Sequence, residues 1–425
     1  MNTVETKVLT TIDFLRDEMV SFLQALVKQP STFGMERSAQ EMVYRKLNSL
    51  GLRAEIWQPR LGDLCAHPAF APVEWDYNGR PNVTATLPGS GGGRSLALNG
   101  HIDVVPPGPL WDWNYDPWGA EIVGDRMYGR GAADMKGGIA MIILALEALL
   151  KCGVALKGNV YFESVIEEEC GGNGALACRL RGQAADADAA IVAEDTNLHL
   201  MIGEMGVMWF RVRVRSGSGH VAMAHKSGNV IESCYSLIQA LKQLEEEMNR
   251  QVCHPYFAGY EHPVNLNIGE IKGGHWPSSV PAECSFTCRL SYEPGISNRE
   301  MRKRVEACLF EASRAIPLLQ QNPPQVDYYG FQSEGDWIDP NQEFIRTLKK
   351  AHLAVFGEEL KGGAFTGTTD VRSFNLYSRV PAVAYGPKGE NIHAANEYVE
   401  LDSIVSGAKT LALFMMDWCG IGEPE

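Results

Sequence analysis

The sequence has no CxxC pair, no long apolar run and no excess of basic residues. Ten cysteines are scattered over 425 residues, which is typical of reduced thiols in a reducing compartment and excludes a disulfide framework. No stretch approaches the ~18 apolar residues that a membrane helix needs. Residues 1–11 lack the apolar centre of a secretion signal. Together with a net charge of −14, these absences predict a cytoplasmic protein that binds neither nucleic acid nor membrane.

The chain is long for a single hydrophobic core, and its pattern changes near residue 207. Polar and apolar residues alternate there as in a half-exposed strand, and the order that follows is helix, strand, strand, helix. We therefore expect a small α+β (β-α-β-β-α) domain at residues 207–328, inserted into an α/β domain made of residues 1–206 and 329–425. The patterns that define the insertion are strands at 207–215, 265–271 and 282–290 and helices at 231–244 and 297–315.

Histidine and acidic residues follow three apolar segments that we expect to be strands. His101 and Asp103 end the first, three glutamates at 167–169 follow the second, and Glu194 follows the third. Consecutive carboxylates at the end of an apolar strand are costly unless cationic charge neutralises them. Since ligands of open α/β sheets bind at the carboxyl ends of strands, one shared site is a more economical interpretation than three separate acidic turns.

Two later segments complete the candidate site. A glycine-rich loop carries Asp134 into a strongly apolar helix, and His393 lies in a loop after the last expected strand. Histidine and carboxylate ligands together suit zinc, cobalt or manganese. Five ligands are too many for one open tetrahedral ion but fit two ions roughly 3.5–4 Å apart that share a carboxylate, with Asp134 as the bridge. The candidates are His101, Asp103, Asp134, Glu168, Glu169, Glu194 and His393.

Four motifs together resemble a known family. They are Gly-His-Ile-Asp-Val-Val-Pro at 100–106, Gly-Arg-Gly-Ala-Ala-Asp-Met-Lys-Gly-Gly at 129–138, Glu-Glu-Cys-Gly-Gly at 168–172 and His-Ala-Ala-Asn-Glu-Tyr at 393–398. In this combination the sequence resembles the acetylornithine deacetylase / succinyl-diaminopimelate desuccinylase family of co-catalytic metallohydrolases, which also holds aminoacylases and glutamate-releasing carboxypeptidases. The resemblance covers nearly the whole chain. It implies a zinc-peptidase-like α/β/α catalytic domain whose insertion serves as a lid and dimerisation domain.

The resemblance also implies a role for each candidate ligand. His101 and Glu194 resemble the ligands of one metal ion, and Glu169 and His393 resemble those of the other. Asp134 resembles the bridging ligand, followed by a cis peptide bond. Asp195 stands where the family commonly has proline, so either Glu194 or Asp195 can be the ligand, and we prefer Glu194.

Further roles follow from the same resemblance. Glu168 is similar to the general acid/base, and Asp103 to the residue that orients His101. His220 resembles the lid histidine that family dimers supply across the subunit interface, and Arg289 resembles an arginine that binds the substrate carboxylate. We expect Thr368 to line the pocket.

Two features have no assigned role. Glu167 is interpreted as bystander charge. The irregular stretch at 61–81, rich in proline, glycine and aromatic residues, is either a functional loop or a surface insertion.

These observations predict a homodimeric amide hydrolase. Two divalent metal ions would activate water for cleavage of a small-molecule N-acyl amino acid or a related carboxylate-bearing amide. Zinc is the preferred metal, with cobalt or manganese as alternatives. The same site would serve a carboxypeptidase or dipeptidase, and carbamoyl-amide hydrolysis is a third possibility. A metal-free binding protein would lack some of the ligands or the base, and none is missing from this sequence.

Overall fold

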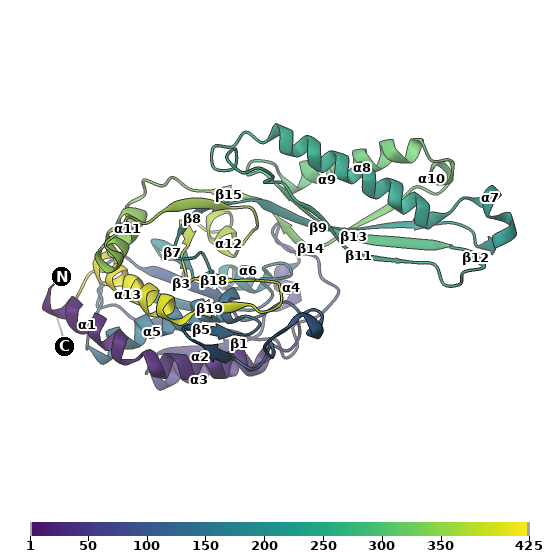
Figure 1. Ribbon diagram of the computed structural model, residues 1–425. Helices are drawn as coiled ribbons and strands as arrows, with labels where there is room; N and C mark the ends of the chain where they lie inside the picture. The colour runs from purple at the N-terminus through teal and green to yellow at the C-terminus, as the bar shows by residue number, and fades with distance from the viewer. Residues whose placement is uncertain (1, 423–425) are drawn as a thin grey trace.

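A computed structural model describes residues 2–422, which form a larger and a smaller part (Figure 1). The larger part is built on a mixed nine-stranded sheet of order β1-β2-β6-β3-β7-β17-β8-β15, in which β16 also pairs with β8. The strands are β1 (Arg53–Trp57), β2 (Asn82–Leu87), β3 (Leu96–His101), β6 (Val160–Val165), β7 (Ala189–Val192), β8 (Leu200–Glu204), β15 (Asp336–Trp337), β16 (Gly362–Phe365) and β17 (Ala382–Ala384).

Helices cover both faces of this sheet. Toward one face, a Cβ on Gly100 of β3 would lie 2.9 Å from Ile139 of helix α5. Toward the other, Asn99 donates to Glu163 of β6, which pairs with Arg179 of helix α6. The helices are α1 (Thr3–Phe14), α2 (Arg16–Val27), α3 (Arg37–Ser49), α4 (Leu61–Leu64), α5 (Gly138–Lys151), α6 (Asn173–Leu180), α11 (Glu343–Phe356), α12 (Val371–Asn375) and α13 (Leu401–Trp418). This α/β/α arrangement confirms the expected fold class.

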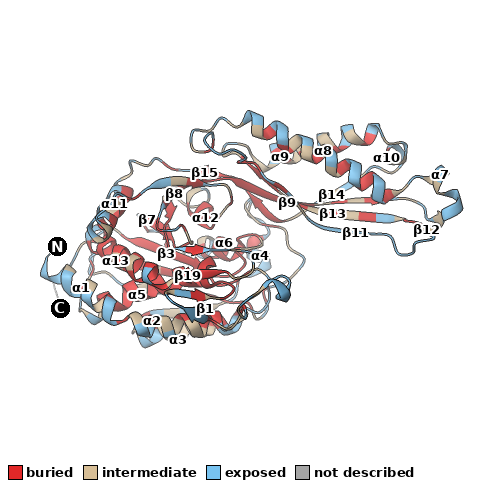
Figure 2. Cartoon of the chain, viewed as in Figure 1, coloured by how far each residue is buried: buried red, intermediate tan, exposed pale blue. Residues whose placement is uncertain are grey.

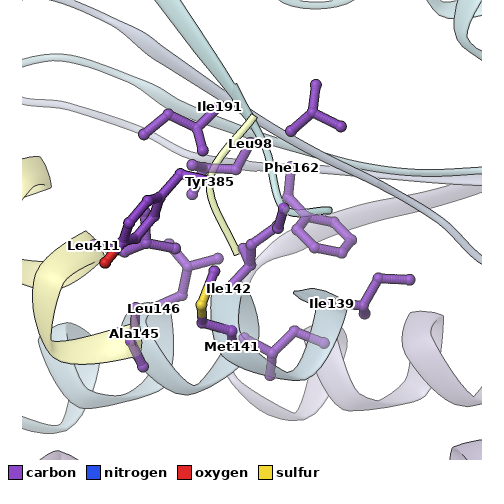
Figure 3. Packing of buried hydrophobic residues seen from close by; sticks show 14 of the residues in the cluster. Leu98, Ile139, Met141, Ile142, Ala145, Leu146, Phe162, Ile191, Tyr385 and Leu411 are labelled. Carbon is purple, nitrogen blue, oxygen red and sulfur yellow. The ribbon is translucent and has the colours of Figure 1, made fainter. Parts of the chain in front are cut away.

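Helix α5 lies at the centre of the main core. Its residues from Gly138 to Leu149 are all buried, because the helix is apolar on every side and packs between the sheet and other helices. Figure 3 shows its side chains beneath Leu98 of β3 and Phe162 of β6, with Leu411 of α13 alongside. This packing holds β3 and β6, whose ends carry the candidate site.

A second, smaller sheet lies beside the site. Its order is β18-β19-β5-β4. It joins the chain before Asp134 to the chain around His393, since β5 and β19 are paired along their length. The strands are β4 (Glu121–Val123), β5 (Arg126–Tyr128), β18 (Gly389–Glu390) and β19 (Tyr398–Glu400).

The smaller part is a four-stranded antiparallel sheet of order β11-β13-β9-β14, covered by two long helices (Figure 1). Buried and exposed residues alternate along β9 (Gly206–Arg215), because one face meets the helices and the other does not (Figure 2). The other elements are β10 (Gly219–His220), α7 (Ala224–Ser227), α8 (Val230–Gln251), β11 (Leu266–Gly273), β12 (Ser279–Val280), β13 (Glu283–Tyr292), α9 (Asn298–Arg314), α10 (Pro317–Gln321) and β14 (Gln325–Ser333).

The smaller part contains strands and helices at the positions expected for the β-α-β-β-α order, and its sheet has one further strand. Strand β14 pairs with β9 and runs across residue 328, where the sequence pattern placed the end of the insertion. This strand then leads back to the larger sheet through β15. None of the described helices is both long and apolar enough to span a membrane.

Candidate active site

The candidate residues meet at one edge of the larger sheet. Strand β3 is parallel to both β6 and β7, so the carboxyl ends of all three strands lie together. His101 is the last residue of β3, Glu168 and Glu169 follow β6, and Glu194 follows β7. The structure therefore brings these three strand ends together at one edge of the sheet.

Asp134 lies between the two histidines. Its Oδ1 is 2.9 Å from Nε2 of His101, and its Oδ2 is 3.2 Å from Nε2 of His393. Glu169 Oε2 is 3.0 Å from the same atom of His393, and Glu194 Oε1 is 3.8 Å from that of His101. The five side chains thus form two groups of donors that share one carboxylate.

The charges in this cluster depend strongly on one another. Burial, together with the charge of Asp134, raises the pKa of Glu169 to about 7 and that of Glu194 well above its ordinary value. Burial opposes protonation of His101 and His393, but the surrounding carboxylates outweigh it and raise the pKa of both rings. Acidic groups this crowded need cationic charge beside them.

Asp103 contacts the site differently from its expected role. The ring Nδ1–H of His101 donates to the main-chain carbonyl of Asp103 at 2.9 Å, whereas the carboxylate lies 3.7 Å away. That carboxylate instead accepts the backbone N–H groups of Glu168 and Glu169, both at 3.2 Å. Asp103 therefore orients the ring of His101 through its backbone carbonyl. Its side chain holds the loop of residues 167–172, called here the glutamate loop, by two hydrogen bonds.

The loop that carries Asp134 is held by Glu397, a residue to which the sequence patterns assigned no role. Asp134 lies in the turn Ala132–Gly137 directly before α5, where its backbone and that of Met135 are not helical, and the expected cis peptide bond joins the two residues. Glu397 Oε1 accepts the backbone N–H groups of Ala133 and Asp134, at 3.0 and 3.1 Å. Its position in the motif at 393–398 was the available signal.

Glu168 lies beside a buried arginine that the sequence reasoning also missed. Arg372 Nη1 is 3.4 Å from Glu168 Oε1, donates to Thr368 Oγ1 at 3.1 Å and also donates to the Thr369 carbonyl. Glu204 accepts from the backbone and hydroxyl of Thr369, at 2.8 and 2.7 Å. These contacts fix the loop before α12 against Glu168.

A cleft of about 1040 Å³ runs from the carboxylates to residues of the smaller part. Its lining includes Trp209, whose ring lies 5.3 Å from that of Phe331 and 6.0 Å from that of Tyr329. Arg289 also lines it, and no carboxylate among residues 2–422 pairs with this side chain. Burial lowers the pKa of Arg289, and its guanidinium is available to a ligand.

The model of peptidase family M20/M25/M40 matches residues 97–417. The chain belongs to this family. Two relatives are N-formyl-4-amino-5-aminomethyl-2-methylpyrimidine deformylases. The one from Halalkalibacterium halodurans is 30% identical over 438 aligned positions, covering 97% of each chain. The one from Bacillus subtilis is 27% identical over 372 positions, covering 82% of this chain and 86% of that protein.

The fold agrees with this assignment. The dipeptidase Dug1p from Saccharomyces cerevisiae superposes with a TM-score of 0.80 at 16% identity, covering 99% of each chain. This M20-family chain is a hydrolase that acts on amide bonds, as the sequence predicted.

His220 does not line the cleft of this M20-family chain. It lies on β10, which pairs with β12, and β12 is at the far end of the smaller part (Figure 1). Its side chain is exposed, and Nδ1 accepts from the backbone of Ala222 at 3.2 Å. The remaining candidates, Glu168, Arg289 and Thr368, all line the cleft.

Two further acidic residues, Asp195 and Glu167, lie next to the candidate ligands in the sequence. Asp195 lies within ligand distance of Asp134 and Glu194, so both acids stay possible ligands. Glu167 was interpreted as bystander charge, and this is wrong, because its buried carboxylate accepts four hydrogen bonds. Burial raises its pKa to about 7.

Proposed function

We propose that this chain is a two-metal deacylase that releases a small acyl group from a primary amine. The observation that carries the proposal is Asp134, whose two oxygens face two different histidines. His101 and Glu194 would hold one ion, Glu169 and His393 the other, and Asp134 both. This mixed nitrogen and oxygen donor set fits zinc best, with cobalt or manganese as alternatives. When bound, such ions lower the pKa of a water molecule to about 7 and polarise an amide carbonyl.

The proton transfers fall to Glu168. Its carboxylate would take the proton of the attacking water and return it to the amide nitrogen as the carbon–nitrogen bond breaks, giving a carboxylic acid and an amine. The guanidinium of Arg372 supports this role because it lies 3.4 Å from Glu168 Oε1 and is buried. This contact fixes the position of the carboxylate that is to transfer the proton.

The amine half of the substrate is proposed to be a flat aromatic or heteroaromatic group. The cleft offers the rings of Trp209, Tyr329 and Phe331, which suit stacking. The two deformylases to which the chain is similar act, by name, on an aminomethylpyrimidine. The free guanidinium of Arg289 favours a second candidate, an N-acyl amino acid or dipeptide with a carboxylate.

Metal analysis and a substrate panel test these proposals together. We expect two bound ions per purified chain, and a Glu168→Gln variant that keeps both ions but loses about 10²–10⁴-fold in kcat. The panel holds N-formyl-4-amino-5-aminomethyl-2-methylpyrimidine, N-acetyl amino acids, dipeptides and carbamoyl amides, each with added cobalt. An Arg289→Met variant should lose only the carboxylate-bearing substrates. A chain that binds neither zinc nor cobalt would contradict the proposal.

We also propose that residues from β9 to β14 act as an inserted lid through which two chains form a homodimer. The exposed position of His220, remote from its own cleft, supports a role in the cleft of a second chain. Ten free cysteines support a cytoplasmic location. Sedimentation of the wild-type chain tests the dimer, and a His220→Ala chain that keeps full turnover would contradict the role in trans.

A further inference from the structure

The irregular stretch at 61–81 reaches the loop that carries Glu168 and Glu169. Beyond helix α4 it has no helix or strand until β2 begins. Two aromatic side chains from it donate to the buried carboxylate of Glu167: Trp75 Nε1 to Oε2 at 2.9 Å and Tyr77 OH to Oε1 at 3.1 Å. The residue before the proposed base is thus held by a segment about ninety positions earlier in the chain.

A buried arginine from the same segment strengthens this contact. Arg80 Nη1 lies 3.4 Å from Glu167 Oε2, and its other nitrogens donate to Glu36, the shortest bond being 2.6 Å. Arg80 also packs over the ring of Phe33, 4.1 Å from its centre, and that ring lies 4.4 Å from Trp75. The arginine therefore sits in a fixed position between two buried carboxylates.

The middle of the segment is anchored as well, at Ala71 and Pro72. Asn173 exchanges two hydrogen bonds of 3.0 Å with the backbone of Ala71, and it donates to Glu167 Oε1 at 2.8 Å. The carbonyl of Pro72 accepts the N–H of Gly330 in β14 at 2.8 Å. Together with Arg80, these bonds hold the segment on both sides of Trp75 and Tyr77, so the aromatic donors are preorganised.

Glu167 is the pivot of the glutamate loop. It adopts a φ of 67°, in the left-handed region that a side chain with a Cβ seldom occupies. Its carbonyl accepts the N–H groups of Gly171 and Gly172, at 3.1 and 2.7 Å. The side-chain bonds of Glu167 offset the cost of this conformation, which directs Glu168 and Glu169 toward the site.

We infer that Trp75, Tyr77 and Arg80 form a clamp on Glu167 that positions the loop of Glu168 and Glu169. These are positioning residues, since they act through Glu167 and do not line the cleft. The inference deepens the proposed function, because Glu168 is its base and Glu169 one of its ligands. Residues 61–81 are then a functional loop, one of the two possibilities that the sequence left open.

A matched pair of double variants tests the clamp. Trp75→Phe/Tyr77→Phe removes the indole N–H and the phenol O–H donors but keeps an aromatic ring at each position. The control, Trp57→Phe/Tyr161→Phe, removes the same two groups elsewhere, from bonds to Thr84 at 3.1 Å and to Asp186 at 2.8 Å. If the double clamp variant does not fold, the half-buried Trp75→Phe alone takes its place.

Hydrogen exchange of the full chain is the first measurement. The amides of residues 168–172 should exchange at least about tenfold faster in the clamp variant, since it loses two hydrogen bonds to Glu167 whose combined contribution exceeds the free energy of a tenfold change. In the control they should exchange at the wild-type rate. Equal exchange in the two double variants would overturn the clamp, whether or not the chain turns over any substrate.

Kinetics on the substrate found by the panel is the second measurement. We expect kcat of the clamp variant to fall at least about tenfold while KM changes less than about threefold, because a displaced base slows chemistry more than binding. The control should keep the wild-type kcat. A clamp variant with faster exchange but unchanged kcat would also overturn the inference. A wild-type chain with no turnover on the panel would count against the proposed function alone, and the exchange rates would still decide the clamp.

Discussion

The carboxylate of Glu397 holds together the loop that presents Asp134. Arg130 Nη1 donates to its Oε2 at 2.5 Å, while its Oε1 accepts two backbone N–H groups of the turn that begins at Ala132. Glu397 is 0% and Arg130 1% exposed, so the pair is screened very little by water. We expect this contact to be among the most sensitive in the protein.

The size of the effect follows from what each substitution leaves behind. Glu397→Ala leaves the buried guanidinium of Arg130 with only the carbonyl of Ala394 as a hydrogen-bond partner. This should lower the free energy of unfolding by ~3–5 kcal/mol. Glu397→Gln keeps an oxygen for the two backbone N–H groups and loses the charge, so we expect ~2 kcal/mol. The double change Arg130→Met/Glu397→Met removes both charges and should cost less than either single change.

Urea unfolding of the four chains measures these differences from the midpoint and slope of each transition. In order of decreasing free energy of unfolding, we expect wild type, then Arg130→Met/Glu397→Met, then Glu397→Gln, then Glu397→Ala. Losses below ~1 kcal/mol for both single variants would match an exposed ion pair and would refute the reasoning from burial.

Two further changes test burial elsewhere. Burial raises the pKa of Asp336 to about 6 from 3.8, so the folded chain binds this proton more tightly than the unfolded chain. The protonated side chain therefore contributes stability below about pH 4, and this contribution is lost as the pH rises through about 6. Above about pH 7, the free energy of unfolding of Asp336→Asn should therefore exceed that of the wild type by up to ~3 kcal/mol. This difference should close near pH 4, and a difference that does not vary with pH would contradict the argument. A Cβ on Gly138 would lie 1.8 Å from the carbonyl oxygen of Ala193, so Gly138→Ala should lower the free energy of thermal unfolding by ~2 kcal/mol or more. Gly217 has open space around it, so the control Gly217→Ala should change this free energy by less than ~1 kcal/mol. Equal effects of the two substitutions would contradict the steric argument.

The candidate residues that meet at the edge of the sheet could be anticipated because each follows from a local pattern. An apolar run that ends in His101, Glu169 or Glu194 identifies a strand and its polar end in the same few residues. Once three such strands are parallel neighbours, their ends meet without further information. The glycines around Asp134 similarly marked a loop that approaches other backbone closely.

Other features depend on residues that are far apart in the sequence. Trp75 and Tyr77 contact Glu167, Arg372 contacts Glu168, and Glu397 contacts the Asp134 turn. Periodicity describes neighbours within one element, and it carries no information on which loop reaches which.

The sequence by itself determined the fold class, the family and the set of strand-end histidines and carboxylates, because these depend on local periodicity and on short motifs. Only the tertiary structure decided how those residues are held: Asp103 bonds to the glutamate loop, Glu167 is clamped, β14 completes the smaller sheet, and His220 lies far from its own cleft. The physical reason is that burial and hydrogen-bond partners arise from long-range packing, which no single segment specifies.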